Sequence, residues 1–173
     1  MEFRFNISPS NNEDKEGIRK LLSITWFEAY NFISEDDILI HLENFYSHEK
    51  LDALFDNENY QCYSVKSQNN LIGWMKLFND KLSGKFFISS LYVLPSFQGN
   101  GIGSELIKLA EEKALQLNYR EIWIGVMKSN LRALNWYKNL GYNFLIEEPF
   151  VMGKTNVSQF IGFKKLNNLN KNS

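Results

Sequence analysis

The sequence predicts an α/β fold, in which a mixed, mostly antiparallel sheet is flanked by helices on both sides. Three observations lead to this expectation. Apolar residues recur at helical spacing before residue 60, three β-rich runs follow between residues 60 and 93, and the remainder alternates helices with strands. The 173 residues suit one domain, expected over residues 1–166, with a flexible tail at residues 167–173 that is rich in Asn and Lys.

The N-terminal third is predicted to form a short strand and three helices. Residues 2–7 alternate like a strand, and one of the asparagines at 11–12 can cap the first helix. Ser34 and Asp37 have the spacing of a capping box, which begins a second helix, and Ser47 can cap a short third helix. The apolar face of the first helix is expected to consist of Ile18, Leu21, Leu22, Thr25, Trp26 and Ala29.

The middle of the chain carries strand-forming residues. Residues 60–65, 71–78 and 85–93 are β-rich, and turn-prone residues separate them at 68–70 and 79–80. Because short loops join neighbouring antiparallel strands, these three runs are expected to form consecutive hairpins.

The C-terminal half is predicted to alternate helices and strands. An amphipathic helix starts at Ile102 and keeps its apolar residues on one stripe up to Leu117. A strand at 121–126 and a helix at 130–140 come next. Two strands, at 142–151 and 160–164, are expected to complete the sheet.

The composition argues against several classes of protein. A net charge of -1 offers no clustered basic face for nucleic acid. Cys62 is the only cysteine, so no disulfide or cysteine-based zinc site can form within the chain, and no His, Cys, Asp or Glu cluster has metal-ligand spacing. No stretch reaches the ~18 apolar residues of a membrane span, and the N-terminus lacks a leader pattern. We therefore expect a cytoplasmic protein that binds neither nucleic acid, nor membrane, nor metal.

A glycine-rich loop joins the strand at 85–93 to the helix that starts at Ile102. The backbone can approach a ligand closely along the run Gln98-Gly99-Asn100-Gly101-Ile102-Gly103-Ser104, and the helix N-terminus suits a pyrophosphate group. The spacing Q-x-x-G-x-G fits neither the dinucleotide pattern G-x-G-x-x-G nor a Walker loop, which needs Lys before Ser. Taken alone, the glycines also fit a plain turn between a strand and a helix.

A second motif lies one strand further along the chain. Asn130, Ala133, Tyr137, Gly141 and Tyr142 follow the pattern N-x-x-A-x-x-x-Y-x-x-x-G-[FY]. Together with the glycine loop, this motif resembles the GNAT superfamily of N-acetyltransferases, which transfer the acetyl group of acetyl-coenzyme A to an amine. The resemblance implies the acyl-CoA N-acyltransferase fold of these enzymes, a strongly twisted sheet in which the cofactor lies where two neighbouring strands part.

The resemblance also implies which residues bind acetyl-coenzyme A. The strand before the loop would offer its backbone to the pantetheine arm, and the loop would hold the pyrophosphate. Asn130 matches a residue that contacts coenzyme A, although an Asn before a helix is as often only an N-cap. Tyr137 matches a tyrosine beside the thioester sulfur, although a helical aromatic commonly packs in the core. The cofactor-binding residues expected on this basis are Leu91, Tyr92, Val93, Gln98, Gly99, Asn100, Gly101, Ile102, Gly103, Ser104, Asn130 and Tyr137.

The expected reaction is direct attack of the amine on the thioester in a ternary complex. A protonated amine with a pKa of ~10.4 must first lose its proton, and the leaving thiolate must then gain one. Tyr137 is the candidate catalytic acid, because a phenol with a pKa of ~10 can donate to a developing thiolate. The resemblance implies that the backbone amide of Val93 polarises the thioester oxygen.

The general base has no clear candidate. Some GNAT enzymes place a glutamate on the strand before the loop, where this chain has Ser89 and Ser90. A water chain to Glu28, Glu147 or Glu148 is one possibility, but such residues are more often solvated surface charges. The base is therefore left unassigned.

The acceptor side is expected to involve the helices before residue 60, which are acidic. An acidic cleft would attract a cationic acceptor such as a polyamine, although charges on helices usually form only a solvated face. The segments at 122–126 and 150–153 are also similar to bacterial spermidine/spermine acetyltransferases. We expect a small-molecule primary amine, with a polyamine among the candidates. A protein or peptide acceptor and a noncatalytic acetyl-coenzyme A sensor are the alternatives, and the sequence is compatible with a monomer or a homodimer. The acidic residues on the helices before residue 60 are Glu28, Glu35, Asp36, Asp37, Glu43, Glu49 and Asp52.

Overall fold

The structure is a computed structural model that describes residues 3–167, so the predicted tail lies outside the described residues apart from Asn167. Its helices are α1 (Lys15–Ala29), α2 (Glu35–Tyr46), α3 (His48–Asp56), α4 (Ile102–Gln116) and α5 (Leu131–Asn139), with 3₁₀ turns at Asn12–Asp14 and Pro95–Phe97. Its strands are β1 (Asn6–Pro9), β2 (Tyr60–Ser67), β3 (Asn70–Asp80), β4 (Lys85–Val93), β5 (Glu121–Met127), β6 (Asn143–Met152) and β7 (Thr155–Lys165).

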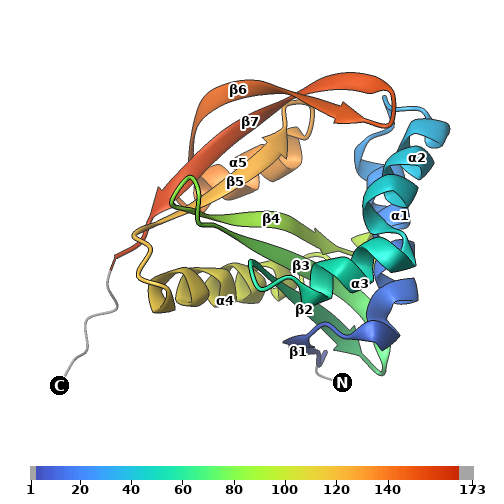
Figure 1. Ribbon diagram of the computed structural model, residues 1–173, viewed down its shortest axis with the longest axis horizontal. Helices are drawn as coiled ribbons and strands as arrows, with labels where there is room; N and C mark the ends of the chain where they lie inside the picture. Colours follow the sequence, from blue (N-terminus) through green and yellow to red (C-terminus); the bar gives the residue numbers. More distant parts are fainter. Residues whose placement is uncertain (1–2, 168–173) are drawn as a thin grey trace.

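The seven strands form one sheet in the order β1-β2-β3-β4-β5-β7-β6 (Figure 1). Every neighbouring pair is antiparallel except β4 and β5, which are parallel. The chain crosses from β4 to β5 through α4, as a parallel connection requires. The predicted α/β fold with a mixed, mostly antiparallel sheet flanked by helices is confirmed.

The starts of two strands differ most from the prediction. β1 lies further along the chain than expected, because it is defined by its pairing with β2, which starts with Asn6 opposite Lys66. β7 begins earlier than expected, because Thr155 pairs with Met152 at the tip of the β6–β7 hairpin. In both cases the neighbouring strand determines the extent of the element more than local propensity does.

Two apolar cores lie on opposite faces of the sheet. One core lies between the sheet and α4 and α5, and it includes Leu106, Ala110 and Ile122. The other lies beneath α1, α2 and α3, and it contains Trp74 of β3 together with most of the predicted apolar face of α1. Ala29 is the exception, since it is exposed at the end of that helix. The helices are therefore placed by the apolar stripes that the sequence predicted.

A buried carboxylate fixes the start of α1 to the sheet. Asp14 is only 3% exposed, and its carboxylate accepts hydrogen bonds from the Ser64 hydroxyl at 2.8 Å and the Asn11 amide at 3.1 Å. Lys66 of β2 also forms an ion pair with it, at 2.5 Å. This carboxylate thus connects the N-terminal turn to β2.

Replacing Asp14 with alanine is expected to lower the free energy of unfolding by about 3 kcal/mol, because the partners of a buried carboxylate are left unsatisfied. The adjacent Glu13 is exposed, so Glu13→Ala serves as the control, with an expected change within about 0.5 kcal/mol. Urea unfolding followed by tryptophan fluorescence measures both. Equal, small losses in the two variants would contradict the assigned role of Asp14.

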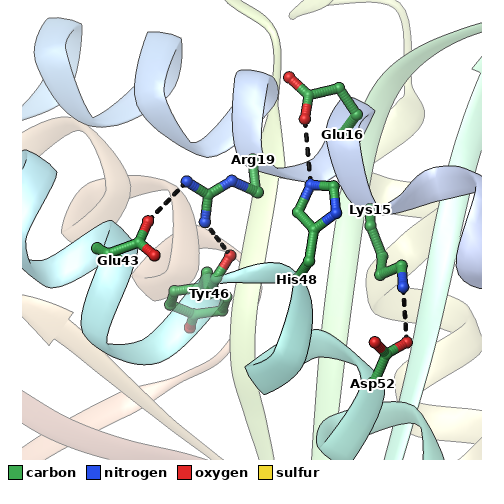
Figure 2. A network of polar contacts seen from close by, with 7 residues as sticks. All are labelled: Lys15, Glu16, Arg19, Glu43, Tyr46, His48 and Asp52. Carbon is green, nitrogen blue, oxygen red and sulfur yellow. Dashed lines mark hydrogen bonds and ion pairs between the residues drawn. The ribbon is translucent and has the colours of Figure 1, made fainter.

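A surface network fastens α2 and α3 to α1 (Figure 2). Arg19 donates to the backbone carbonyl of Tyr46 at 2.6 Å and forms an ion pair with Glu43 at 2.9 Å. On the neighbouring turn of α1, Lys15 pairs with Asp52 of α3 at 2.7 Å. The three helices consequently form one layer over this face of the sheet.

Candidate active site

The two central strands separate soon after they meet. β4 and β5 pair only at Phe87 with Trp123 and at Ile88 with Ile124, although both strands continue beyond these residues. The pairing of β4 with β3 shifts by one residue at the same point, which leaves Ser89 as a bulge. Because a bulge bends a strand, it accounts for the way β4 turns away from β5 in Figure 1. The parting of two strands implied by the sequence resemblance is therefore present.

Backbone groups of β4 face the space between the parted strands. The amide of Leu94 donates to the carbonyl of Ile72 in β3 at 2.9 Å. Alternate residues of an antiparallel strand point to the same neighbour, so the amide of Val93 points away from β3, toward the side that β5 has left. The Val93 carbonyl accepts a hydrogen bond from the Gln98 side chain at 3.0 Å. The Val93 amide is thus directed at the gap.

The glycine loop that follows β4 has the conformation that its glycines allow. Gly99 and Gly101 have φ angles of +83° and +80°, which side-chain-bearing residues rarely adopt. A Cβ atom at either position would meet nothing within 4 Å, so the space beside the loop is open. Gly101 is the N-cap of α4, and no side chain caps that helix. The first amides of α4 are therefore oriented to bind an anion.

Other residues of the loop have internal roles. The side chain of Asn100 donates to the carbonyl of Phe97 at 3.0 Å, and Gln98 binds Val93 as described. Gly103 packs closely against α5, because a Cβ there would lie 3.1 Å from ring atoms of Trp136. The contacts available to a ligand from this loop therefore come mainly from its backbone.

Tyr137 of α5 is buried in the core between the sheet and helices α4 and α5. It is 5% exposed and packs edge-on against Trp136 and Tyr142, with ring centroids 4.7 Å and 5.4 Å away. Burial raises the pKa of Tyr137, and the nearby hydroxyl of Tyr30 raises it further. The hydroxyl is therefore protonated at neutral pH, and the residue also serves as part of the core.

Asn130 and two tyrosines lie together near Tyr137. Asn130 caps α5, since its side-chain oxygen accepts a hydrogen bond from the amide of Ala133 at 3.1 Å. Burial raises the pKa of Tyr30, while hydrogen bonds with the side chains of Tyr92 and Asn130 act in the opposite direction. Side chains from the end of α1, from β4 and from α5 thus converge. Tyr30 was not identified from the sequence, because an aromatic residue at a helix end gives no distinguishing signal.

The wall formed by α1 and α2 is rich in aromatic rings. Trp26 lies 5.5 Å from both His41 and Tyr46, measured between ring centroids, and His41 lies 5.7 Å from Phe150 of β6. Burial lowers the pKa of His41, and the positive charge of Lys76 lowers it further. Surroundings that disfavour a charged imidazole also disfavour other cations, including a protonated amine.

The candidate water-linked bases lie on the surface. Glu28 is exposed, Glu147 pairs with Lys128 at 2.9 Å, and Glu148 accepts a hydrogen bond from Gln159 at 2.8 Å. The bulge residue Ser89 is exposed as well.

The position after the bulge carries a polar chain in place of a carboxylate. The hydroxyl of Ser90 lies 3.4 Å from that of Tyr46, which accepts a hydrogen bond from Lys76 at 2.9 Å. None of these three groups is a carboxylate, so the general base stays unassigned.

Most acidic side chains of the N-terminal helices form a solvated face. Glu43 and Asp52 are engaged with α1 in the network of Figure 2. The exposed remainder consists of Glu28, Glu35, Asp36 and Glu49. Asp37 differs, because its carboxylate accepts hydrogen bonds from the amide of Lys154 and the hydroxyl of Thr155 in the β6–β7 turn.

The capping box predicted at the start of α2 is only half formed. The Ser34 hydroxyl accepts a hydrogen bond from the Asp37 amide at 3.2 Å, as predicted. The reciprocal bond to the Ser34 amide is absent from the cap, because the Asp37 carboxylate turns to the β6–β7 hairpin instead. A tertiary partner has replaced the local one.

Residues 3–167 show neither a metal-binding cluster nor a membrane-spanning helix. Within them, no group of three or more His, Cys, Asp or Glu side chains is positioned to hold a metal ion. No helix in this part of the chain is long and apolar enough to cross a membrane.

Comparison with known proteins adds three findings. The sequence profile of the acetyltransferase (GNAT) family matches residues 17–142. An uncharacterized N-acetyltransferase of Lactobacillus delbrueckii subsp. lactis is 28% identical over 77% of this chain and 80% of its own length. The thialysine N-epsilon-acetyltransferase of Bos taurus is 38% identical, but over only 35% of this chain and 36% of its own length.

A solved structure has the same fold. The crystal structure of the PaiA N-acetyltransferase from Thermoplasma acidophilum, in complex with coenzyme A, superimposes with a TM-score of 0.79. The superposition covers 94% of this chain and 99% of that chain, at 23% sequence identity. The chain therefore shares its overall fold with this N-acetyltransferase.

Proposed function

The chain belongs to the acetyltransferase (GNAT) family and is an acetyl-coenzyme A-dependent N-acetyltransferase, and we propose that its acceptor is the primary amine of a small molecule. One observation carries this proposal. The β6–β7 turn is hydrogen-bonded to α2, so the helices on one side of the parted strands are joined to the hairpin on the other side. An acceptor side enclosed in this way suits a slim amine better than a folded protein surface.

The residues of the chain fit acetyl-coenzyme A at the parted strands. When bound, this cosubstrate supplies an acetyl group activated as a thioester. We assign the pantetheine contacts to the backbone of residues 91–93 and the pyrophosphate contacts to the amides of residues 99–104, where the loop is open. The amide of Val93, directed at the gap, is assigned to the thioester oxygen. Asn130 is assigned a positioning role, through its cap on α5.

Burial affects the two groups that exchange protons in the proposed reaction, the hydroxyl of Tyr137 and the acceptor amine. Tyr137 is assigned as the acid that protonates the leaving thiolate, because a phenol hydroxyl is protonated at neutral pH and burial raises its pKa further. The aromatic rings of Trp26, Tyr30 and Phe150 favour deprotonation of the amine, because desolvation disfavours the ammonium form. Direct attack in a ternary complex then needs no covalent enzyme intermediate.

The structure says less about the chemical class of the amine than about its slim shape. An open cavity of about 450 Å³ beside the N-terminus of α2 is lined by Asp36, Asp37 and Lys154, among others, so its charge is mixed. Mixed charge does not single out a polycation, and similarity to a thialysine enzyme adds amino acids with a side-chain amine to the candidates. We propose a polyamine or such an amino acid as the acceptor, in the cytoplasm, where the free thiol of Cys62 would stay reduced.

The test is free-thiol release from acetyl-coenzyme A with a panel of amines. The panel contains spermidine, spermine, lysine, thialysine, an aminoglycoside and short peptides with a free N-terminus or a Lys side chain. Turnover of a small amine with a kcat/KM about tenfold or more above that of every peptide is expected. Preference for peptides would establish the protein acetyltransferase alternative, and acetyl-coenzyme A binding without any turnover would favour the sensor.

A further inference from the structure

The turn between β6 and β7 is bound to the first turn of α2. The Asp37 carboxylate accepts hydrogen bonds from the Lys154 amide and the Thr155 hydroxyl, each at 2.6 Å. Asp37 is 9% exposed, and these bonds lower its pKa, so the side chain is ionised at neutral pH. The contact joins residues that are 117 and 118 positions apart in the sequence. Its hydrogen bonds are therefore charge-assisted and mostly shielded from water.

The backbones of the two segments also touch. Gly153 has a φ of +62°, and a Cβ atom there would lie 2.5 Å from both the Cα and the carbonyl oxygen of Asp37. Such a separation is far shorter than any ordinary contact between a side chain and a backbone. Only glycine therefore satisfies both the conformation of the turn and its approach to α2.

The contact completes a ring of elements around the parted strands. β5 and its neighbour β7 lie on one side of the gap, and β4, covered by α1 and α2, lies on the other. Figure 1 shows the β6–β7 hairpin extending from the sheet to α2. Inside this ring, Phe150 and Met152 of β6 pack in the same cluster as Trp26, and the ring of Phe150 lies 5.7 Å from that of His41. The hairpin thereby forms a roof over the acceptor side.

We propose that this contact of Asp37 with Gly153, Lys154 and Thr155, here named the α2–turn bridge, determines acceptor specificity by holding the roof closed. A closed roof admits an amine on a slim chain and excludes peptides and branched amines. The proposal rests on the proposed function, because it explains how a small amine is selected. Asp37 is then a positioning residue that acts through the hairpin and does not touch the reacting atoms.

Two substitutions break the bridge from opposite sides. Asp37→Asn removes the negative charge of the side chain that accepts the hydrogen bonds, and Gly153→Ala inserts a Cβ against α2. Each has a matched control in the same chain. Glu35→Gln removes a charge from the same helical turn at an exposed residue, and Gly84→Ala imposes similar strain at a φ of +67° where a Cβ meets nothing. Thr155→Val, which removes one hydrogen bond, is the mildest variant and the least prone to unfold.

The measurement is the ratio of kcat/KM for a slim amine to kcat/KM for a short Lys-containing peptide. Both bridge variants are expected to lower this ratio about tenfold or more, with a smaller shift in the same direction for Thr155→Val. The two controls should stay within about twofold of the unsubstituted protein, as should KM for acetyl-coenzyme A in every variant. A merely structural role would not change the ratio, because a loss of folded protein lowers both values equally.

Binding provides a readout that does not need turnover. Calorimetric titration of the coenzyme A complex with the slim amine and with the peptide gives a corresponding ratio, that of the two dissociation constants. An unchanged ratio in Thr155→Val and in whichever of the two bridge variants folds would overturn the proposal. Peptide preference in the unsubstituted protein would instead refute the proposed function, which is read from that protein alone.

Discussion

Replacing Tyr137 with phenylalanine is expected to lower kcat about 10²–10³-fold, the scale on which a positioned general acid contributes. The ring is retained, so its edge-on packing against Trp136 and Tyr142 is retained too. Only the hydroxyl is lost, and because burial raises its pKa, this hydroxyl stays protonated well above neutral pH. Steady-state kinetics measure kcat and KM, and calorimetry should show acetyl-coenzyme A affinity within about twofold of the unsubstituted protein.

Tyr142 provides the matched control for this substitution. It is 2% exposed, burial raises its pKa as well, and its hydroxyl has no hydrogen-bond partner within residues 3–167. Tyr142→Phe should therefore keep kcat within about twofold, because removing an unsatisfied hydroxyl costs little. A Tyr137→Phe variant with full kcat would remove Tyr137 from the mechanism, and an equal loss in both variants would indicate damaged packing.

The pKa of Tyr137 also determines the alkaline side of the pH profile. A catalytic acid is lost when the pH rises above its pKa, and burial moves the pKa of this hydroxyl upward from the usual ~10. Activity is therefore expected to rise as the acceptor amine loses its proton and to show no decline from Tyr137 up to about pH 10.

Replacing Gly101 with alanine is expected to weaken coenzyme A binding about tenfold or more, measured by calorimetry on the folded variant. Gly101 has a φ of +80° and provides the N-cap of α4, the position from which the first amides of the helix are presented. A Cβ there meets no protein atom within 4 Å, so it projects into the open space that the ligand needs. A loss of affinity would thus have two causes, the changed conformation of the loop and a Cβ that obstructs the approach of coenzyme A to the loop.

The control for Gly101 is again Gly84, in the turn between β3 and β4. Both glycines have positive φ and open surroundings, so each alanine adds similar strain, about 1–2 kcal/mol, to the folded state. Gly84→Ala is therefore expected to lower stability without changing coenzyme A affinity. If Gly101→Ala bound coenzyme A as tightly as Gly84→Ala, the glycine loop would not be the pyrophosphate site.

Local patterns predicted most of the elements. The serine at 34 caps α2 and the serine at 47 caps α3, as expected from cap chemistry, and the three β-rich runs form consecutive hairpins. The residues of the glycine loop were also selected from sequence, because a strand, a tight turn and a helix N-terminus leave a local signature. In these cases the interactions that determine the structure lie within a few residues of one another.

The errors share one cause. The Asp37 carboxylate was expected to complete a local capping box, but it binds a turn more than one hundred residues away. β7 extends further than its composition predicted, because Thr155 gains a partner across the hairpin. For Asp37 a long-range partner competed with the local one and prevailed. In both cases the pairing partner, and not the composition of the segment itself, determined the outcome.

The sequence by itself determined the fold class and the family, and it predicted the loop that we propose as the pyrophosphate site, because each depends on local periodicity or on a compact motif. The tertiary structure alone decided what encloses the proposed acceptor side. Tyr30 meets Tyr92 and Asn130, and α2 meets the β6–β7 turn, only after the sheet has brought distant segments together. Such contacts depend on strand order and on the bend at Ser89, and the fold as a whole determines both.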